Sequence, residues 1–164
     1  MASDIHIRNY RESDRDNLWS IMEPTFRSGE SYPVDQNISK EDGLTYWLQP
    51  AHQVFIAERN STALGTYYLK ANQSGGGSHV ANCGYIVAPE ATGNGIASAM
   101  CTHSQEQARQ QNFRAMQFNF VISTNKGAVR LWKKHGFEVV GTLPKAYAHP
   151  SLGFVDAFVM YKTL

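Results

Sequence analysis

Residues 87–97 read Val-Ala-Pro-Glu-Ala-Thr-Gly-Asn-Gly-Ile-Ala, and this stretch says more about the fold than any other part of the chain. The apolar run that leads into it indicates a strand, the proline ends that strand, and a helical pattern starts after the second glycine. Gly93 and Gly95 thus lie at a helix N-terminus, where unpaired N–H groups and the helix dipole favour an anion. Glycine also lacks the Cβ that would keep a phosphate away. We therefore predict a strand–turn–helix unit that binds a phosphate-bearing ligand through its main chain; a tight turn without a ligand is the alternative.

Two common phosphate-binding motifs do not fit this stretch. A P-loop has Lys and then Ser or Thr after its last glycine, but Gly95 is followed by Ile96 and Ala97. A dinucleotide-binding motif needs an acidic residue about 20 positions further on, and residues 112–119 contain none.

The segment Thr92–Ala97 instead resembles the (Arg/Gln)-x-x-Gly-x-(Gly/Ala) motif of the GCN5-related N-acetyltransferases, the GNAT superfamily, with threonine in its first position. Residues 125–137 are similar to a second motif of that superfamily, Asn-x-x-Ala-x-x-Leu-Tyr-x-x-x-Gly-Phe, with Trp132 in place of the tyrosine. Both motifs occur in the superfamily's order, about 30 residues apart, which is far more specific than a lone Gly-x-Gly. Residues 5–14 are similar to its usual first strand and helix start, so the resemblance covers nearly the whole chain.

The resemblance implies an α+β (mixed α/β) protein with the GNAT fold. Its central sheet would be mixed and mostly antiparallel, with six to seven strands, splayed beside the cofactor and with helices on both faces. Hydrophobic periodicity agrees, since it predicts strands and helices without strict β–α alternation. The predicted strands are residues 5–10, 54–59, 63–70, 79–87, 115–122, 138–143 and 154–161. The predicted helices run from Ser13 or Asp14 to about Phe26, after Ser39, after Gly95 and before Gly136.

The composition is that of one globular domain covering residues 1–164. Hydrophobic residues make up 42% and charged residues 18% of the chain, and the formal net charge is +1. No bulk field therefore attracts nucleic acid or an anionic membrane, and neither is predicted as a partner. Without a signal peptide or a long apolar run, a cytoplasmic location is expected. Cys83 and Cys101 lack metal-ligand spacing, so we expect buried reduced thiols and no metal site.

The resemblance also implies acetyl-CoA as the cosubstrate. In the superfamily, the strand before the first motif holds the pantetheine and the acetyl carbonyl through main-chain groups, and the glycine turn holds the diphosphate. The corresponding residues are Tyr85, Ile86, Val87, Thr92, Gly93, Asn94, Gly95, Ile96 and Ala97. Asn125 matches an asparagine beside the pantetheine, although a helix N-cap calls for the same residue type. Thr92 lacks the long side chain that is usual at its position, but its hydroxyl can still donate to a phosphate oxygen.

Trp132 stands where the family often has a tyrosine that protonates the departing thiolate. An indole N–H cannot transfer a proton at accessible pH. A thiol with an ordinary pKa of about 8.5 is nevertheless a fair leaving group near neutrality, so acid catalysis is helpful rather than obligatory. We interpret Trp132 as a cofactor-contacting residue that packs against or solvates the thiolate; plain core packing is the alternative.

Two asparagines interrupt otherwise apolar strands, and a buried amide without partners costs roughly 1–3 kcal/mol. The resemblance implies that the strands of Asn82 and Asn119 are the two that splay apart beside the cofactor. Both residues are therefore candidate catalytic residues that bind or align the acceptor. The alternative is a pair of satisfied amides that bridge the strand edges. This region is also locally similar to the branch of the superfamily that includes fungal acetyltransferases of proline-like amino acids.

No general base stands out from the sequence. Loops on a rigid scaffold commonly set specificity, so segments 27–38 and 144–153 are expected to contact the acceptor. The candidate acceptor-binding residues are Glu30, Tyr32, Tyr67, His79 and Tyr147, with His149 beside them. For the two histidines, an ordinary surface or core imidazole is the alternative interpretation.

The sequence therefore suggests an N-acetyltransferase that modifies a primary or secondary amine of a small molecule or amino acid by direct attack. Nothing near Cys83 supplies an activating base, which disfavours a covalent enzyme intermediate. One alternative is a non-catalytic acyl-CoA-binding module, suggested by Thr92 and Trp132. Another is an acetyltransferase of protein N-termini or lysines. A homodimer formed through sheet edges is an expectation from family analogy alone.

Overall fold

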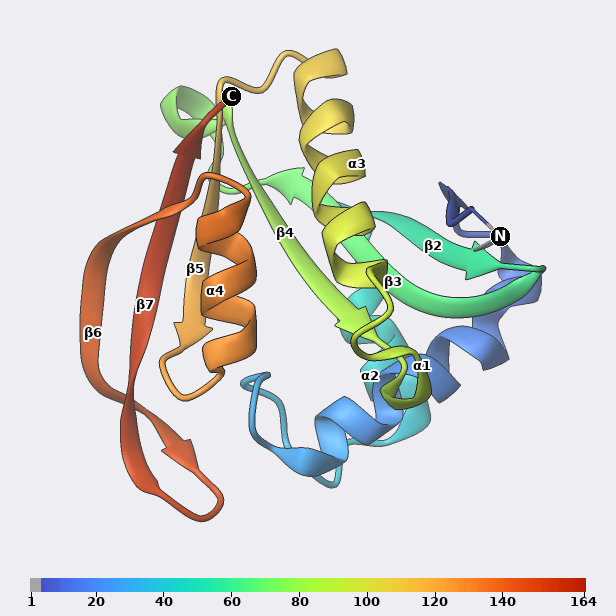
Figure 1. The fold of residues 1–164 in the computed structure, drawn as a ribbon, viewed down its shortest axis with the longest axis horizontal. Helices are drawn as coiled ribbons and strands as arrows, with labels where there is room; N and C mark the ends of the chain where they lie inside the picture. Colours follow the sequence, from blue (N-terminus) through green and yellow to red (C-terminus); the bar gives the residue numbers. More distant parts are fainter. Residues whose placement is uncertain (1–3) are drawn as a thin grey trace.

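The computed structural model describes residues 4–164, which build a seven-stranded sheet with the spatial order β1-β2-β3-β4-β5-β7-β6 (Figure 1). The strands are β1 (His6–Asn9), β2 (Gln53–Arg59), β3 (Thr62–Ala71), β4 (Val80–Val87), β5 (Ala115–Ile122), β6 (Glu138–His149) and β7 (Gly153–Thr163). All neighbours are antiparallel except β4 and β5, which are parallel. The predicted mixed, mostly antiparallel sheet is confirmed.

Helices cover both faces of this sheet. They are α1 (Arg15–Ser28), α2 (Lys40–Trp47), α3 (Ile96–Gln110) and α4 (Lys126–Lys134), with short 3₁₀ turns η1 (Glu12–Asp14), η2 (Gly75–Gly77) and η3 (Pro89–Ala91). Trp47 of α2 packs on Tyr68 with ring centroids 4.9 Å apart, whereas the hydroxyl of Tyr67 is 2.7 Å from Nδ1 of His103 in α3. Successive strand residues point to opposite faces, so α2 and α3 lie on opposite sides of β3.

Strands β4 and β5 pair only at their first residues, Val80 with Ala115 and Ala81 with Met116. Nδ2 of Asn82 then donates to the Gln117 carbonyl at 2.9 Å, and beyond this bond the strands diverge (Figure 1). The sheet is therefore open between two central strands rather than at its edge.

The strand predicted at residues 115–122 is present as β5, but its side chains do not alternate regularly after Phe118, because the pairing of β5 with β7 shifts between Phe118 and Val121. A β-bulge of this kind moves the following side chains to the other face. Val121 accordingly joins Phe118 in the main core, while Phe120 and Ile122 pack in a second, small cluster.

The loop predicted at residues 144–153 is shorter than expected. β6 resumes its pairing with β7 at Tyr147 and runs to His149, so only residues 150–152 form the turn. Pro144 lies at the irregularity between Leu143 and Tyr147 on this edge strand, where its missing N–H costs no ladder bond.

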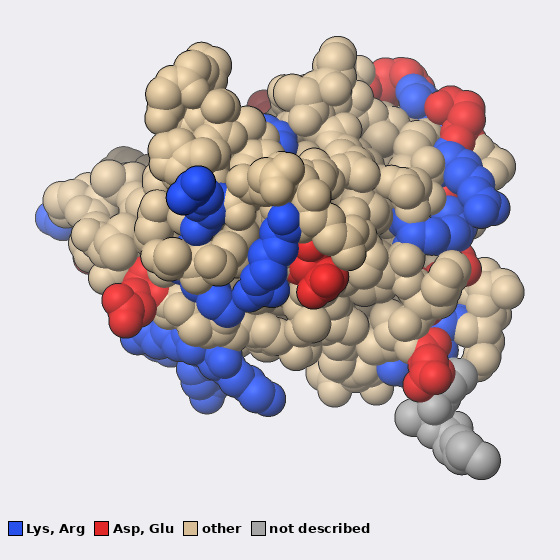
Figure 2. All heavy atoms as spheres, turned by 90° about the horizontal axis from the view of Figure 1, so that it is seen from above, with Lys and Arg blue, Asp and Glu red and all other residues tan. Residues whose placement is uncertain are grey.

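Charged side chains are dispersed on the face that Figure 2 shows, with Lys and Arg interspersed with Asp and Glu among uncharged residues. This distribution agrees with the formal net charge of +1. Within residues 4–164, no helix is both long and apolar enough to cross a bilayer.

A partly buried ion pair joins β1 to the start of α1. The guanidinium of Arg8 donates to both carboxylate oxygens of Asp14, at 2.8 and 2.9 Å, and Asp14 also accepts the Arg11 N–H at 2.8 Å. Asp14 is only 5% exposed. The Arg8 guanidinium holds the pKa of Asp14 below its ordinary value.

We predict that Asp14→Asn lowers the free energy of unfolding at pH 7 by about 1.5–3 kcal/mol, because it weakens a charge-assisted bidentate bond. Since the folded pKa of Asp14 is depressed, its contribution is complete above the ordinary pKa of 3.8 and is lost as the pH falls through the folded value. The difference between the two proteins, measured by urea denaturation, should therefore shrink on acidification. Asp16→Asn, which breaks an exposed pair with Lys40, is the control and should change stability little. Equal losses in both variants would contradict the prediction.

Candidate active site

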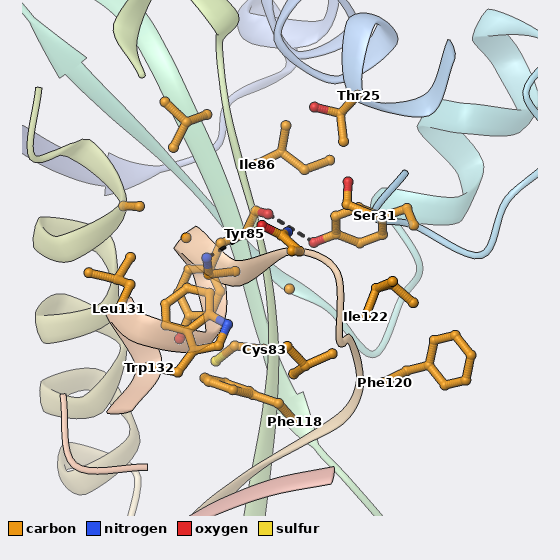
Figure 3. Close-up of a pocket in the computed structure, with 18 of the residues that line it drawn as sticks. Thr25, Ser31, Cys83, Tyr85, Ile86, Phe118, Phe120, Ile122, Leu131 and Trp132 are labelled. Carbon is orange, nitrogen blue, oxygen red and sulfur yellow. Dashed lines mark hydrogen bonds between the residues drawn. The ribbon is translucent and has the colours of Figure 1, made fainter. Parts of the chain in front are cut away.

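The gap between β4 and β5 opens into a cavity of about 800 Å³. Leu131 and Trp132 line it on one side of β4, and Thr25 and Ser31 line it on the other (Figure 3). The cavity is thus bordered by α4 and the glycine turn on one face of the sheet and by α1, α2 and β3 on the other. Two reactants approaching from opposite faces would meet in the gap.

No side chain caps the start of α3, whose N-cap residue is Gly95. The first bond inside the helix runs from the Ala99 N–H to the Gly95 carbonyl at 3.0 Å. The N–H groups of Ile96, Ala97 and Ser98 therefore have no partner within the helix, and all three residues line the cavity. Together with the positive end of the helix dipole, these donors form a site suited to an anion.

The glycines before α3 are required by backbone conformation and not by crowding. Gly93 and Gly95 have φ angles of +81° and +80°, and a Cβ at either position would meet no atom within 4 Å. The space that a side chain would fill is therefore open. Arg59 steadies the turn by donating to the Asn94 carbonyl at 3.2 Å; Asn94 itself does not line the cavity.

Alternate main-chain groups of β4 face the gap. The bonds from Asn72 N–H to the Val80 carbonyl and from Ala88 N–H to the Leu64 carbonyl show that even-numbered residues of β4 face β3. The N–H and C=O groups of Cys83, Tyr85 and Val87 therefore face the gap, whereas those of Ile86 point to β3. The hydroxyl of Tyr32 donates to the Tyr85 carbonyl at 3.0 Å.

An aromatic wall closes the cavity on the α4 side. Trp132 is 8% exposed, and its ring centroid lies 4.9 Å from that of Tyr85 and 5.1 Å from that of Phe118 (Figure 3). The Tyr85 hydroxyl is held by Oγ of Ser104 at 2.7 Å, on the α3 side. The Asn125 carboxamide accepts the Ala128 N–H at 3.4 Å, so it caps α4 while also lining the cavity.

Both predicted asparagines line the cavity, but their amides are bound within the protein. Asn82 is 6% exposed and donates to the Gln117 carbonyl. Asn119 donates to Oδ1 of Asn72 at 2.6 Å and accepts from Nε2 of Gln117 at 2.9 Å. These bonds support the interpretation in which the asparagines bridge the strands where the splay begins.

Of the residues predicted to bind the acceptor, only Tyr32 lines the main cavity. The side chain of Tyr67 lies against α3, whereas its neighbour Tyr68 lies on the opposite face of the sheet and lines the cavity. His79 is exposed and lies at the paired end of β4, away from the gap. Tyr147 is buried, and its hydroxyl donates to the carbonyls of Gly29 and Tyr32.

Glu30 and His149 lie at a second hollow of about 530 Å³, beside the start of α4. The sequence reasoning missed several residues on the α1, α2 and β3 side of the main cavity. They are Thr25, Ser31, Pro33, Tyr46, Tyr68 and Lys70. Side chains of β3 alternate between the two faces of the sheet, so Tyr68 and Lys70 could have been predicted together if the sequence had shown which face borders the cavity.

The thiol that lines the cavity is not activated. Burial raises the pKa of Cys83 to about 12 and that of Cys101 to about 11. Both cysteines are free thiols, and residues 4–164 contain no cluster of three or more His, Cys, Asp or Glu able to hold a metal. Cys83 is therefore protonated near neutral pH and is a poor nucleophile.

Comparison with known proteins identifies one family. Residues 15–137 match the model of the acetyltransferase (GNAT) family. A GCN5-related N-acetyltransferase from Kribbella flavida superimposes with a TM-score of 0.92 and 33% identity over 98% of both chains. N-acetyltransferase aca1 of Schizosaccharomyces pombe is 25% identical over an alignment 150 positions long, which covers 80% of this chain and 71% of that protein. The yncA protein of Salmonella typhimurium, solved with its cofactor acetyl-CoA, has the same fold, with a TM-score of 0.84 and 19% identity over 99% of this chain and 95% of its own.

We predict that neither cysteine of the native protein reacts rapidly with a thiol-specific disulfide reagent at pH 8, because both thiols are buried and have raised pKa values. In guanidinium chloride, both should react. The measurement is the coloured thiolate that the reagent releases on reaction with a cysteine. Release of one equivalent of this thiolate by the native protein within seconds would contradict the prediction.

Proposed function

The chain belongs to the GNAT family of acetyltransferases, and we propose that it transfers the acetyl group of acetyl-CoA to a primary or secondary amine of a small molecule or amino acid by direct attack. One observation carries this proposal: a single cavity extends from the uncapped start of α3, along the Tyr85 edge of β4, to the opposite face of the sheet. A cosubstrate on one face of the sheet and an acceptor on the other would therefore meet in the gap.

The residues of the cavity fit acetyl-CoA. The N–H groups of Gly93, Gly95, Ile96, Ala97 and Ser98 would bind the diphosphate, with the Thr92 hydroxyl beside them. The main-chain groups of Cys83, Tyr85 and Val87 would pair with the amides of the pantetheine arm. Leu131 and Trp132 form the apolar wall beside it. When bound, acetyl-CoA supplies the activated acetyl thioester.

The chain's own contribution to the chemistry is orientation and hydrogen-bond donation. N–H groups on the gap side of β4 would stabilise negative charge on the acetyl oxygen. Burial keeps the pKa of Tyr32 well above its ordinary value, so its hydroxyl stays protonated and donates to the Tyr85 carbonyl. Trp132 would shield a bound thioester from water but would give no proton. The protonated Cys83 thiol leaves direct attack by the amine as the route.

Two further expectations belong to this proposal. Residues 1–164 would form one acetyltransferase domain, supported by one sheet and one main core cluster that extends from Leu18 to Met160. The protein would work in the cytoplasm, supported by its two free, buried thiols, which suit a reducing compartment.

The proposal is tested by incubating the protein with acetyl-CoA and a panel of amines, amino acids and peptides while free thiol is measured. Thiol release with small amines or amino acids is expected. CoA binding without turnover of any amine would indicate a non-catalytic module. Turnover of peptides alone would indicate an acetyltransferase of protein N-termini or lysines.

We predict that Gly93→Ala weakens CoA binding about ten- to a hundredfold in isothermal titration, because the new Cβ displaces the diphosphate from charge-assisted bonds. Gly75→Ala is a matched control, since Gly75 also has a positive φ, of +56°, and open space at its Cβ but lies outside the cavity. Both variants should lose similar stability. Unchanged CoA affinity in Gly93→Ala would contradict the assignment of the turn.

Trp132→Phe should keep the rate of acetyl transfer within a few-fold, because a ring that only packs is replaced by another ring. Trp132→Ala should instead lower the free energy of unfolding by about 3–5 kcal/mol. The measurements are steady-state kinetics and urea denaturation. A folded Trp132→Phe enzyme slowed more than a hundredfold would show that the indole N–H takes part in the reaction.

A further inference from the structure

We propose that Lys70 binds a carboxylate of the acceptor, so that the preferred acceptor is an amino acid or another small amine that carries a carboxylate. This inference rests on the function proposed above and specifies the acceptor of the same cavity.

Lys70 is the single charged residue among the described residues that line the main cavity. The cavity is bordered by Tyr68 and Lys70 but not by Tyr67 or Leu69, as expected if one face of β3 points into it. Tyr68 is on the face that packs against α2. Lys70 therefore lies on the side of the sheet opposite to α3, where the acceptor would enter.

Within residues 4–164, the Lys70 ammonium has no counter-ion. Lys70 is half-buried, and none of the ion pairs or hydrogen bonds found in residues 4–164 includes its side chain. The nearby His52 stacks on Tyr68 at 4.0 Å and binds the Trp47 carbonyl at 2.8 Å, and burial, followed by the Lys70 charge, lowers its pKa. A lone cation at a partly desolvated cavity wall gains from a ligand that brings the opposite charge.

The position of Lys70 suits the acceptor and not the cosubstrate. Lys70 pairs with Asn82 across β3 and β4, whereas Val87, next to the glycine turn, pairs with Gly65. Five residues along a strand span about 17 Å, which separates Lys70 from the diphosphate donors. Tyr85 is three residues from Asn82, or about 10 Å, a span that a lysine side chain and a small amino acid can bridge together.

Aromatic side chains line the same cavity as Lys70. Tyr32, Tyr46 and Tyr68 all border it. Burial raises the pKa of each of these phenols, so they remain neutral and add no negative charge that would repel a carboxylate. The arrangement provides an apolar wall for the body of the acceptor and one cation for its acid group.

The test compares wild-type protein with Lys70→Gln and Lys70→Arg on paired acceptors: the twenty standard L-amino acids and their L-amino acid amides. Lys133→Gln, on the exposed side of α4 and outside the cavity, removes the same charge as a control. Because the acid and the amide differ in the basicity of the amine, the measured quantity is the acid-to-amide ratio of kcat/KM relative to wild type. Titration of the protein–CoA complex with the same acids measures binding without turnover.

We expect Lys70→Gln to lower this ratio about ten- to a hundredfold, and Lys70→Arg and Lys133→Gln to preserve it within a few-fold. CoA affinity should be the same in all four proteins. An unchanged ratio in Lys70→Gln, or equal losses on acids and amides, would overturn the inference while leaving the proposed function intact.

If no amine is acetylated, the proposed function fails by itself. The affinity of the protein–CoA complex for the amino acids then decides the role of Lys70. Loss of this affinity in Lys70→Gln but not in the other variants supports the inference. Equal affinity in wild type and Lys70→Gln, or no binding of the acids to wild type, overturns it.

Discussion

The parallel pairing between β4 and β5 ends after two residue pairs, and the rest of the site depends on this interruption. A continuous ladder would satisfy the N–H and C=O groups of Cys83, Tyr85 and Val87 and would leave no room for a ligand between the strands. Because the strands part, these groups face a cavity at the centre of the sheet. The next helix, α3, begins at the open end with its own donors free. This single interruption of the β4–β5 ladder would thereby provide a groove for an extended ligand and an anion-binding site at the end of that groove.

The two sides of the gap differ in their electrostatics. On the side of α3 and α4, anion binding relies on main-chain N–H groups and a helix dipole, and no charged side chain among the described residues lines that part of the cavity. On the other side, Lys70 is a cation among tyrosines. Because an indole N–H gives up no proton at accessible pH and the Cys83 thiol is protonated, we expect neither Trp132 to act as a general acid nor Cys83 to act as a nucleophile. The protein would therefore promote acetyl transfer mainly by orientation and by donors placed for the developing oxyanion.

Local signals in the sequence predicted the parts of the site that local structure builds. Gly93 and Gly95, with the proline before them, indicated the turn and the helix start, and Ser39 caps α2 through its hydroxyl as expected. Long-range features had no such signal. Tyr67 and Tyr68 are adjacent tyrosines, so only the packing of α2 and α3 decides which of them reaches the cavity. The bulge after Phe118 in β5 depends on the partner strand and cannot be seen in the alternation of one segment.

Hydrogen exchange tests the central claim most directly, because it follows individual main-chain N–H groups with and without CoA. The account predicts that CoA slows exchange most strongly in residues 93–98, with a second protected region at residues 83–87, while the paired start of β4 changes little. Protection confined to other parts of the chain, or no protection at saturating CoA, would contradict it.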